Sequence, residues 1–393
     1  MDIKSSVAEL AKAIAPSCQA IREHLHQYPE LSFEEAQTAA FIQKELDKIG
    51  VSYQSNVAGH GIVAVIEGQN PDSRCIALRA DMDALPITED SQQPYASKHQ
   101  GIMHACGHDM HTACLIGALH VLQQTKTHWQ GKVKAIFQPA EEKLPGGASL
   151  MIKEGVLNNP NVHHIVGQHV FPELAAGKVG FRPGMYMASC DELYIEVHGK
   201  GGHGAMPHQC IDPVYAASSL IVNMQQVVSR FVDPTVPAVL SFGSIEGKGA
   251  TNVIPETVHI KGTFRTLDEN WRSEVHRKIK EVAQGTAQAT GTDIEVEIKK
   301  GYPYLENDTE LTLKMIEAAK AYLGADKVVD LPIRMTGEDF AYYGHEVPAC
   351  FYRLGVRNEA KGIVYPVHHP KFDVDVAAYE TGIGLMAFLA INS

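Results

Sequence analysis

The 393-residue sequence contains no CxxC pair, and its cysteines are odd in number and widely scattered. A disulfide framework needs ordered pairs, so none is expected, and unpaired thiols are typical of a reducing compartment. The seven positions are Cys18, Cys75, Cys106, Cys114, Cys190, Cys210 and Cys350.

Long apolar runs and an excess of positive charge are also missing. The densest apolar stretch, around residues 382–391, is shorter than the ~20 residues that span a bilayer. The first residues, MDIKSSVAELAK, lack the charged-then-apolar pattern of a signal peptide. Lysine and arginine total 34 against 46 acids, a net charge of -12, which disfavours nucleic acid and anionic membranes as partners. We therefore expect a cytoplasmic protein with no membrane or nucleic-acid partner.

The length suits two domains, and the first third alternates helices with strands. Apolar runs predict buried strands, and a periodic pattern predicts a helix from residue 109 to about 124. Alternating strands and helices imply a largely parallel sheet covered on both faces. The predicted strands are 61–68, 75–81, 132–138 and 164–170.

A helix is predicted for SFEEAQTAAFIQKELDKIG, which runs from Ser32 to Gly50. Ser32 and Glu35 have the spacing of a capping box, in which the two side chains satisfy the first amides of a helix. Gly50 stands where a left-handed C-cap is expected.

Beyond Gly184 the pattern changes to alternating strands with two amphipathic helices, at 212–231 and about 270–289. The order strand, helix, two strands, helix, strand resembles a small α/β sandwich with an antiparallel sheet. The first pattern returns after Gly301. The predicted fold is α/β, with a mostly parallel-sheet domain formed by residues 1–183 and 301–393 and an inserted lid domain of residues 184–300.

Polar residues follow the predicted strands of the first domain at their carboxyl ends, where open α/β sheets form their sites. Asp81 and Asp83 end one strand, Glu141 and Glu142 follow another, and His169 lies in a third. Each has an ordinary alternative. Asp83 could begin a turn, the paired glutamates could form a solvated face, and His169 could be a hydrogen-bonded core histidine.

The segment MHACGHDMH places Cys106 and His108 at the start of a helix, a position that lowers the pKa of a thiol. VHHPKF adds His368 and His369 late in the chain. Cysteine, histidine and glutamate together form a mixed ligand set for ions such as zinc, manganese or cobalt. Five ligands with Glu141 as a spare carboxylate suit two ions with an open position, as a hydrolytic site requires.

Nine ordered segments resemble the aminoacylase-like dinuclear metallopeptidase family, and more closely its branch of N-acyl-L-amino acid, hippurate and auxin-conjugate amidohydrolases. The resemblance covers essentially the whole chain. It implies a catalytic domain of zinc-peptidase type interrupted by a dimerising lid, a homodimer, and two divalent ions per subunit (zinc, manganese, cobalt or nickel). The segments are LRADMDALPI, MHACGHDMH, QPAEE, GQHV, GKGGHGAMPH, TNVIPE, GTFRT, GEDFAYY and VHHPKF.

The resemblance also implies residue roles. Glu141 would be the general base and Asp83 a carboxylate that orients a ligand. Many relatives have a histidine at Asp81, but this branch uses His108 instead, so Asp81 is not assigned as a ligand. His368 is chosen over His369 because relatives show histidine, a variable residue, then proline. The implied metal ligands are Cys106, His108, Glu142, His169 and His368.

Three residues of the lid match family positions near the substrate. His203 corresponds to a histidine that reaches the partner subunit's active site, although a surface histidine in a glycine-rich turn is the ordinary alternative. Asn252 and Arg265 resemble residues that bind the substrate carboxylate, which an arginine fork can grip at two points. Alternatively, Asn252 caps a turn and Arg265 is a strand-edge cation. Glu338 matches a family signature without a physical role.

The predicted function is metal-dependent hydrolysis of the amide in N-acyl-L-amino acids, with acetyl, benzoyl or a similar acyl group. A dipeptidase or an aminobenzoyl-glutamate hydrolase is an alternative that uses the same site. An amidase with Cys106 as nucleophile would need no metal. A zinc nucleoside deaminase lacks its HxE and PCxxC motifs here. A non-catalytic metal-binding protein would leave Glu141 and the lid residues unexplained.

Overall fold

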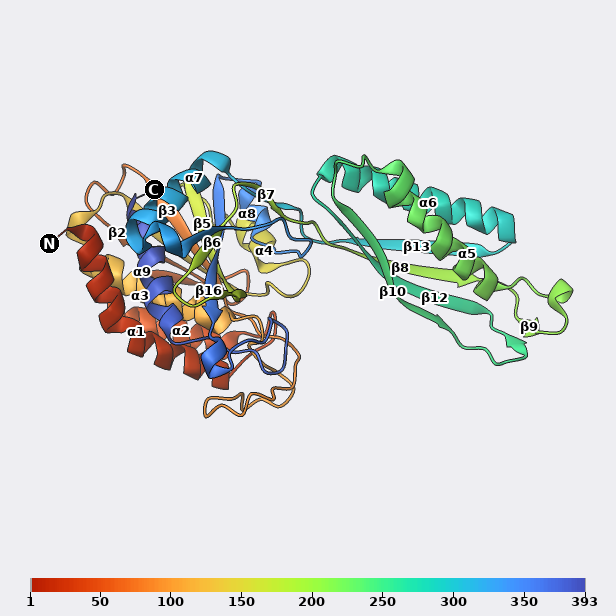
Figure 1. Cartoon of the computed structure of the whole chain (residues 1–393), viewed down its shortest axis with the longest axis horizontal. Helices are drawn as coiled ribbons and strands as arrows, with labels where there is room; N and C mark the ends of the chain where they lie inside the picture. The colour runs from red at the N-terminus through yellow and green to blue at the C-terminus, as the bar shows by residue number, and fades with distance from the viewer. Residues whose placement is uncertain (1, 393) are drawn as a thin grey trace. The chain divides into compact units, whose positions relative to one another are not determined.

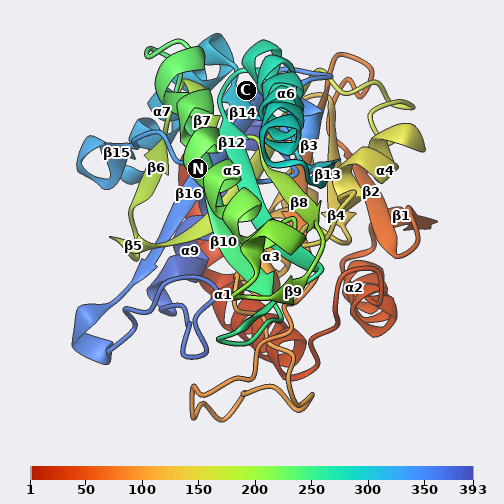
Figure 2. The same cartoon turned by 90° about the vertical axis from the view of Figure 1, so that its right-hand side faces the viewer.

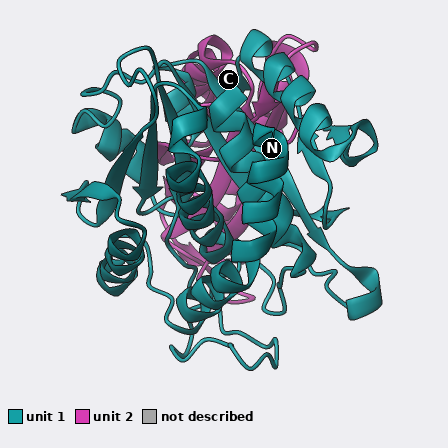
Figure 3. Cartoon of the chain, turned by 90° about the vertical axis from the view of Figure 1, so that its left-hand side faces the viewer, with its two compact units in different colours: residues 1–184, 306–332, 339–393 teal, residues 185–305, 333–338 magenta. Residues whose placement is uncertain are grey.

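The computed structural model describes residues 2–392, and the chain divides into two compact units (Figure 3). Unit 1 comprises Met1–Gly184, Glu306–Pro332 and Asp339–Ser393. Unit 2 comprises Met185–Leu305 and Ile333–Glu338.

Unit 1 is built on an eight-stranded mixed sheet with the order β1-β2-β4-β3-β5-β16-β6-β15 (Figure 1). The four central strands, β4, β3, β5 and β16, run parallel, while β1, β2 and β6 are antiparallel to a neighbour. The predicted α/β class with a mostly parallel sheet is confirmed. The strands are β1 Ser52–Val57, β2 Gly61–Glu67, β3 Cys75–Asp81, β4 Lys132–Gln138, β5 His164–Ala175, β6 Val179–Phe181, β15 Val328–Asp330 and β16 Ala349–Arg357.

The central strands are apolar because both of their faces are covered. Every residue of β3 is buried, as is almost every residue of β4 and β16. Since β3, β4 and β5 are parallel, their carboxyl ends meet at one edge of the sheet. The polar residues that follow these strands are therefore brought together there.

Helices α1, α3, α7 and α9 contact one another in one large apolar core, and α4 contacts α8 separately. Helices α3 and α9 are apolar on nearly all sides, and most of their residues are buried. No helix within residues 2–392 is both long and apolar enough to cross a bilayer. The helices are α1 Ile3–Gln27, α2 Ala36–Ile49, α3 His108–Gln124, α4 Gly147–Lys153, α7 Thr309–Leu323, α8 Ala341–Gly344 and α9 Ala377–Asn392.

The predicted capping box of α2 (Ala36–Ile49) is wrong, because neither Ser32 nor Glu35 caps this helix. The Glu30 carboxylate does so instead, accepting two amides of the first turn at 3.2 and 2.8 Å. The C-terminal prediction is confirmed, since Gly50 is left-handed with a φ of 74°. Ser32 and Glu35 point elsewhere, into buried surroundings.

Unit 2 is a four-stranded antiparallel sheet, β10-β12-β8-β13, with α5 and α6 packed side by side on one face (Figure 2). Apolar residues from the sheet and both helices form its core. Unit 2 also includes residues 333–338, which the sequence prediction assigned to the first domain. Its helices are α5 Pro213–Gln226, continued by a π-helix at Val227–Phe231, and α6 Glu269–Thr290; its sheet strands are β8 Asp191–His198, β10 Ala238–Gly247, β12 Thr257–Thr266 and β13 Asp293–Lys300. Shorter strands, which include residues of both units, are β7 Gly184–Met187, β9 Gly202–His203, β11 Val253–Ile254 and β14 Leu305–Asn307.

Candidate metal centre

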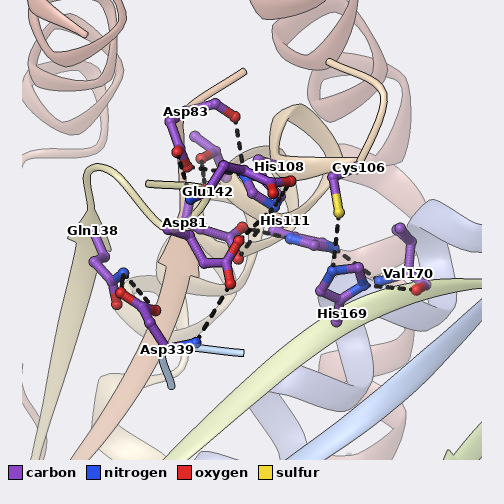
Figure 4. A network of polar contacts seen from close by, with 12 residues as sticks. Asp81, Asp83, Cys106, His108, His111, Gln138, Glu142, His169, Val170 and Asp339 are labelled. Atoms are coloured by element: carbon purple, nitrogen blue, oxygen red, sulfur yellow. Dashed lines mark hydrogen bonds and ion pairs between the residues drawn. The ribbon is translucent and has the colours of Figure 1, made fainter. Parts of the chain in front are cut away.

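Five possible ligand side chains converge at the carboxyl edge of the unit 1 sheet. Four of them, Cys106, His108, Glu142 and His169, are labelled in Figure 4. Cys106 Sγ lies 3.4 Å from Nε2 of His169, which is carried by β5. Glu142, which follows β4, has Oε1 3.9 Å from Nε2 of His108 and 3.3 Å from Nε2 of His368. We call these five residues the candidate metal centre.

The spacing and chemistry of these atoms fit divalent ions. Two ligand atoms about 2.1 Å from one tetrahedral ion are themselves roughly 3.4 Å apart, close to the observed separations. Nε2 of His108 is buried and has no hydrogen-bond partner among residues 2–392. An unpartnered polar atom is costly when buried, so a ligand-binding role explains it. Three overlapping groups, each with its ligand atoms within 4.8 Å of one another, allow two adjacent ions: Cys106, His108 and His169; Cys106, Glu142 and His368; and His108, Glu141 and Glu142.

Two of the histidines are held by their other ring nitrogen. Nδ1 of His108 lies 2.9 Å from the carbonyl oxygen of Asp83 and 3.0 Å from its Oδ1. Nδ1 of His169 donates to the carbonyl oxygen of Val170 at 2.8 Å. A proton on Nδ1 leaves the Nε2 lone pair available, which is the tautomer that a metal-binding imidazole needs.

Asp83 connects several parts of the centre. Its Oδ2 accepts the Ser32 hydroxyl at 2.7 Å and the amide of Glu142 at 2.9 Å. Although burial favours the neutral carboxyl, hydrogen bonds from His108 and Ser32 lower the pKa of Asp83. The carboxylate thus orients both an imidazole and the segment that carries a glutamate.

Glu141 and Glu142 are neighbours in sequence but face different groups. Oε1 of Glu141 accepts the amide of Asp339 at 3.4 Å, and its Oε2 lies 4.0 Å from Nε2 of His108. Glu141 is 6% exposed. Glu142 therefore lies among the possible ligand atoms, while Glu141 holds one carboxylate oxygen beside them.

Sequence reasoning missed a buried ionic network behind the centre. Arg79 of β3 donates to Asp81 at 2.6 Å, to Asp339 at 2.8 Å and to Gln138 at 2.9 Å. All four side chains are fully buried. The available signal was a lone arginine inside the apolar run CIALRAD, because a buried guanidinium requires acidic or carbonyl partners.

The same network explains His111, the third histidine of MHACGHDMH. Its Nδ1 lies 2.6 Å from Oδ1 of Asp81, while its Nε2 accepts the amide of Val170 at 2.8 Å. Both ring nitrogens are occupied, so His111 supports the strand that carries His169 and offers no lone pair to an ion.

The expectation of an acidic thiol at Cys106 was wrong. Helix α3 begins at His108, and Cys106 lies before it in a buried position. Burial, with Glu142 nearby, raises the pKa of the Cys106 thiol. The buried side chain therefore lacks the partial exposure of a free cysteine nucleophile.

Of the two histidines in VHHPKF, the structure brings His368 to the centre. His368 is left-handed, with a φ of 65°, and its amide donates to the carbonyl oxygen of Ala105 at 2.8 Å. His369 stacks on Tyr365, with ring centroids 4.5 Å apart. A strained backbone at a side chain that reaches the ligand group is typical of a functional position.

The other predicted site residues belong to unit 2. His203 and Asn252 are exposed neighbours, because β9 pairs with β11 and the Gly204 amide donates to the Asn252 carbonyl at 2.8 Å. Arg265 is half-buried in β12, and Glu338 is buried. The roles of these residues stay predictions.

The α/β fold brings thiol, imidazole and carboxylate groups together at one edge of its sheet, with Glu141 beside them. This combination is typical of the class of metal-dependent hydrolases. Residues 77–392 match Peptidase family M20/M25/M40, and the chain belongs to this family.

Two similar proteins are named for the removal of an acyl group from an amino acid. An N-acetyl-L-cysteine deacetylase of Bacillus subtilis is 43% identical over 91% of this chain and 83% of its own. An N-acyl-L-amino acid amidohydrolase of Geobacillus stearothermophilus is 41% identical over 76% of this chain and 80% of its own. Among solved structures, a dinuclear metal binding peptidase of Bacillus subtilis is 35% identical with a TM-score of 0.83, covering 97% of this chain and 98% of its own.

Proposed function

We propose that the protein is a metal-dependent amidohydrolase that cleaves N-acyl-L-amino acids to a carboxylate and a free amino acid. The observation that carries the proposal is Glu141, a buried carboxylate held beside the candidate metal centre with one oxygen 4.0 Å from His108. The two relatives with 43% and 41% identity are named for the same reaction class.

The ligands that we propose for two divalent ions are those of the candidate metal centre: Cys106, His108, Glu142, His169 and His368. Such ions would polarise the substrate carbonyl and lower the pKa of bound water from about 15.7 towards about 7. Zinc, manganese, cobalt and nickel all suit this donor set. Which of them is bound depends on metal supply, which often outweighs ligand preference.

Glu141 would then act as the general base and general acid. Its carboxylate accepts a proton from the attacking water and passes it to the departing amine. Asp83 keeps His108 and the Glu142 segment in place. We further propose that His203 of the partner subunit stabilises the oxyanion, and that Asn252 and Arg265 bind the substrate carboxylate.

A dipeptidase or aminobenzoyl-glutamate hydrolase is the second candidate, favoured by the similarity to a solved peptidase. It would use the same ions and the same base. A panel of N-acyl amino acids and dipeptides, assayed for amine release, separates the two candidates by the ratio of kcat/KM values.

Metal removal is expected to abolish activity. Dialysis of the purified protein against a chelator should reduce amine release to background, and adding manganese, zinc or cobalt should restore it, because all five proposed ligands act through the ions. The measurement is the initial rate across the panel before dialysis, after dialysis and after each addition.

The control is alkylation of the thiols in saturating metal, which would block a cysteine nucleophile. Activity that survives chelation and disappears when thiols are alkylated in saturating metal would instead identify Cys106 as a nucleophile and reject the metal mechanism.

We also propose a homodimer formed through unit 2, and a cytoplasmic location in keeping with its free cysteines. Helix α5 exposes Val214, Tyr215 and Val222 by 42, 64 and 71% of their surfaces. It contacts β10, an edge strand that exposes Val239 and Ile245. Exposed apolar side chains beside an unpaired strand edge are typical of a self-association surface.

Val222→Asp is expected to convert the dimer to a monomer, because it places a charge in the proposed apolar interface. Sedimentation or light scattering gives the mass. The matched control is Leu313→Asp on α7, an apolar residue that is 50% exposed in unit 1. A dimer that persists in Val222→Asp, or is lost equally in Leu313→Asp, would contradict the proposed interface.

A further inference from the structure

The segment between α1 and α2, residues 30–35, contacts the residues that directly follow β3 and β4 at the candidate metal centre. The carbonyl oxygen of Glu30 accepts the amide of Ala84 at 2.8 Å, and Leu31 forms a parallel bridge with Ala84. The segment turns sharply at Phe33, whose φ of 70° is left-handed. A strained conformation of a large residue persists only where the surroundings fix it.

The first side-chain contact is from Ser32 to Asp83. The Ser32 hydroxyl is buried and donates to Oδ2 of Asp83 at 2.7 Å. The same Asp83 oxygen accepts the amide of Glu142, and the other oxygen lies 3.0 Å from Nδ1 of His108. Ser32 therefore fixes the carboxylate that orients two of the proposed ligands.

The second contact is from Glu35 to the turn that carries both glutamates. Oε1 of Glu35, a fully buried residue, accepts the amide of Ala140 at 2.7 Å. Ala140 is left-handed, with a φ of 51°, and is followed directly by Glu141. A hydrogen bond to the amide of a strained residue holds the turn, and with it the direction of the next two side chains.

Helix capping does not explain these two side chains, because Glu30 already satisfies the first amides of α2. We propose that Ser32 and Glu35 are positioning residues of the candidate metal centre, Ser32 acting through Asp83 and Glu35 through the Ala140 turn. The effect that we expect on turnover rests on the proposed function. The effect that we expect on metal binding does not.

A neutral mimic of Glu35 is available. Burial and the neighbouring Asp83 carboxylate raise the pKa of Glu35 to about 7, so an amide side chain resembles its protonated form. Glu35→Gln keeps an oxygen that accepts the Ala140 amide, whereas Glu35→Leu removes every acceptor. Glu30→Ala is the matched control, since it alters the same segment and removes the cap of α2 but leaves both positioning contacts.

The experiment titrates the full-length, metal-depleted chain with cobalt, follows the visible absorption of the bound ion, and then measures kcat and KM at saturating cobalt. Loss of a residue that orients ligands typically weakens metal binding or activity about 10- to 100-fold. Glu35→Leu is therefore expected to raise the cobalt dissociation constant about tenfold or more, change the spectrum, and lower kcat more than it changes KM. Glu35→Gln is expected to stay within about threefold of the wild type, and Glu30→Ala to lower only thermal stability.

A folded Glu35→Leu with wild-type cobalt affinity, spectrum and kcat would overturn the inference. An equally large loss of cobalt affinity and kcat in Glu30→Ala would also overturn it, because the loss would then come from general destabilisation of the segment. Should Glu35→Leu not fold, Ser32→Ala decides, and an unchanged cobalt affinity there also rejects the inference. A wild type that binds cobalt but hydrolyses no substrate would reject the proposed function alone, because the cobalt titration needs no substrate.

Discussion

Glu141→Gln is expected to lower kcat about 1,000-fold, or ~4 kcal/mol of transition-state stabilisation, while the protein keeps its metal. Glutamine has nearly the shape of glutamate and still accepts the Asp339 amide through an oxygen, but it takes up no proton. Because Glu142, and not Glu141, is a proposed ligand, metal content should stay at the wild-type value. Steady-state kinetics and metal analysis of the same preparation provide the test.

The control is Glu154→Gln, the same chemical change at a carboxylate whose Oε2 accepts the amide of Ala58 at 2.9 Å. It should leave kcat unchanged. Near-normal turnover in Glu141→Gln would exclude the general-base role. A loss of turnover with an equal loss of metal would make Glu141 a ligand instead.

The second large effect concerns folding. Arg79→Met is expected to lower the free energy of unfolding by about 3–5 kcal/mol, because it leaves buried acids without their cation. The carboxylates of Asp81 and Asp339, both fully buried, accept hydrogen bonds from this guanidinium at 2.6 and 2.8 Å. The measurement is the midpoint of urea unfolding in the metal-depleted protein.

A matched surface substitution separates a buried network from an ordinary ion pair. Arg277→Met removes an arginine of α6 that pairs with two exposed glutamates, and such pairs contribute under about 1 kcal/mol. The double variant Arg79→Met, Asp339→Asn should lose less free energy of unfolding than the sum of the two single losses. Each single change already removes the same ion pair. Equal losses in the two arginine variants would contradict the expected role of Arg79.

The strand ends could be predicted because the signal lies within a few residues. An apolar run that stops at Asp81, or at Pro139 before two glutamates, marks where a buried strand reaches an edge of the sheet. Parallel strands then bring those ends together whatever the details of the helices. The α/β class followed from the same alternation and is confirmed.

The capping box failed for the opposite reason. Ser32 and Glu35 have the right local spacing, but their partners lie 51 and 105 residues away along the chain. A local pattern cannot show that tertiary acceptors and donors will compete for the same side chains. Arg79 is similar, since the residue that anchors it, Asp339, is 260 residues distant.

The position of β5 in the sheet has a consequence for the order in which the chain is made. β5 carries His169 and lies between β3 and β16, and β16 is completed only at Arg357. On the ribosome, β5 therefore emerges about 180 residues before its second neighbour, with one row of backbone groups unpaired in the meantime. His368 follows later still. The nascent protein must therefore protect a central strand through the synthesis of all of unit 2, and its full set of proposed metal ligands exists only after His368 has been made.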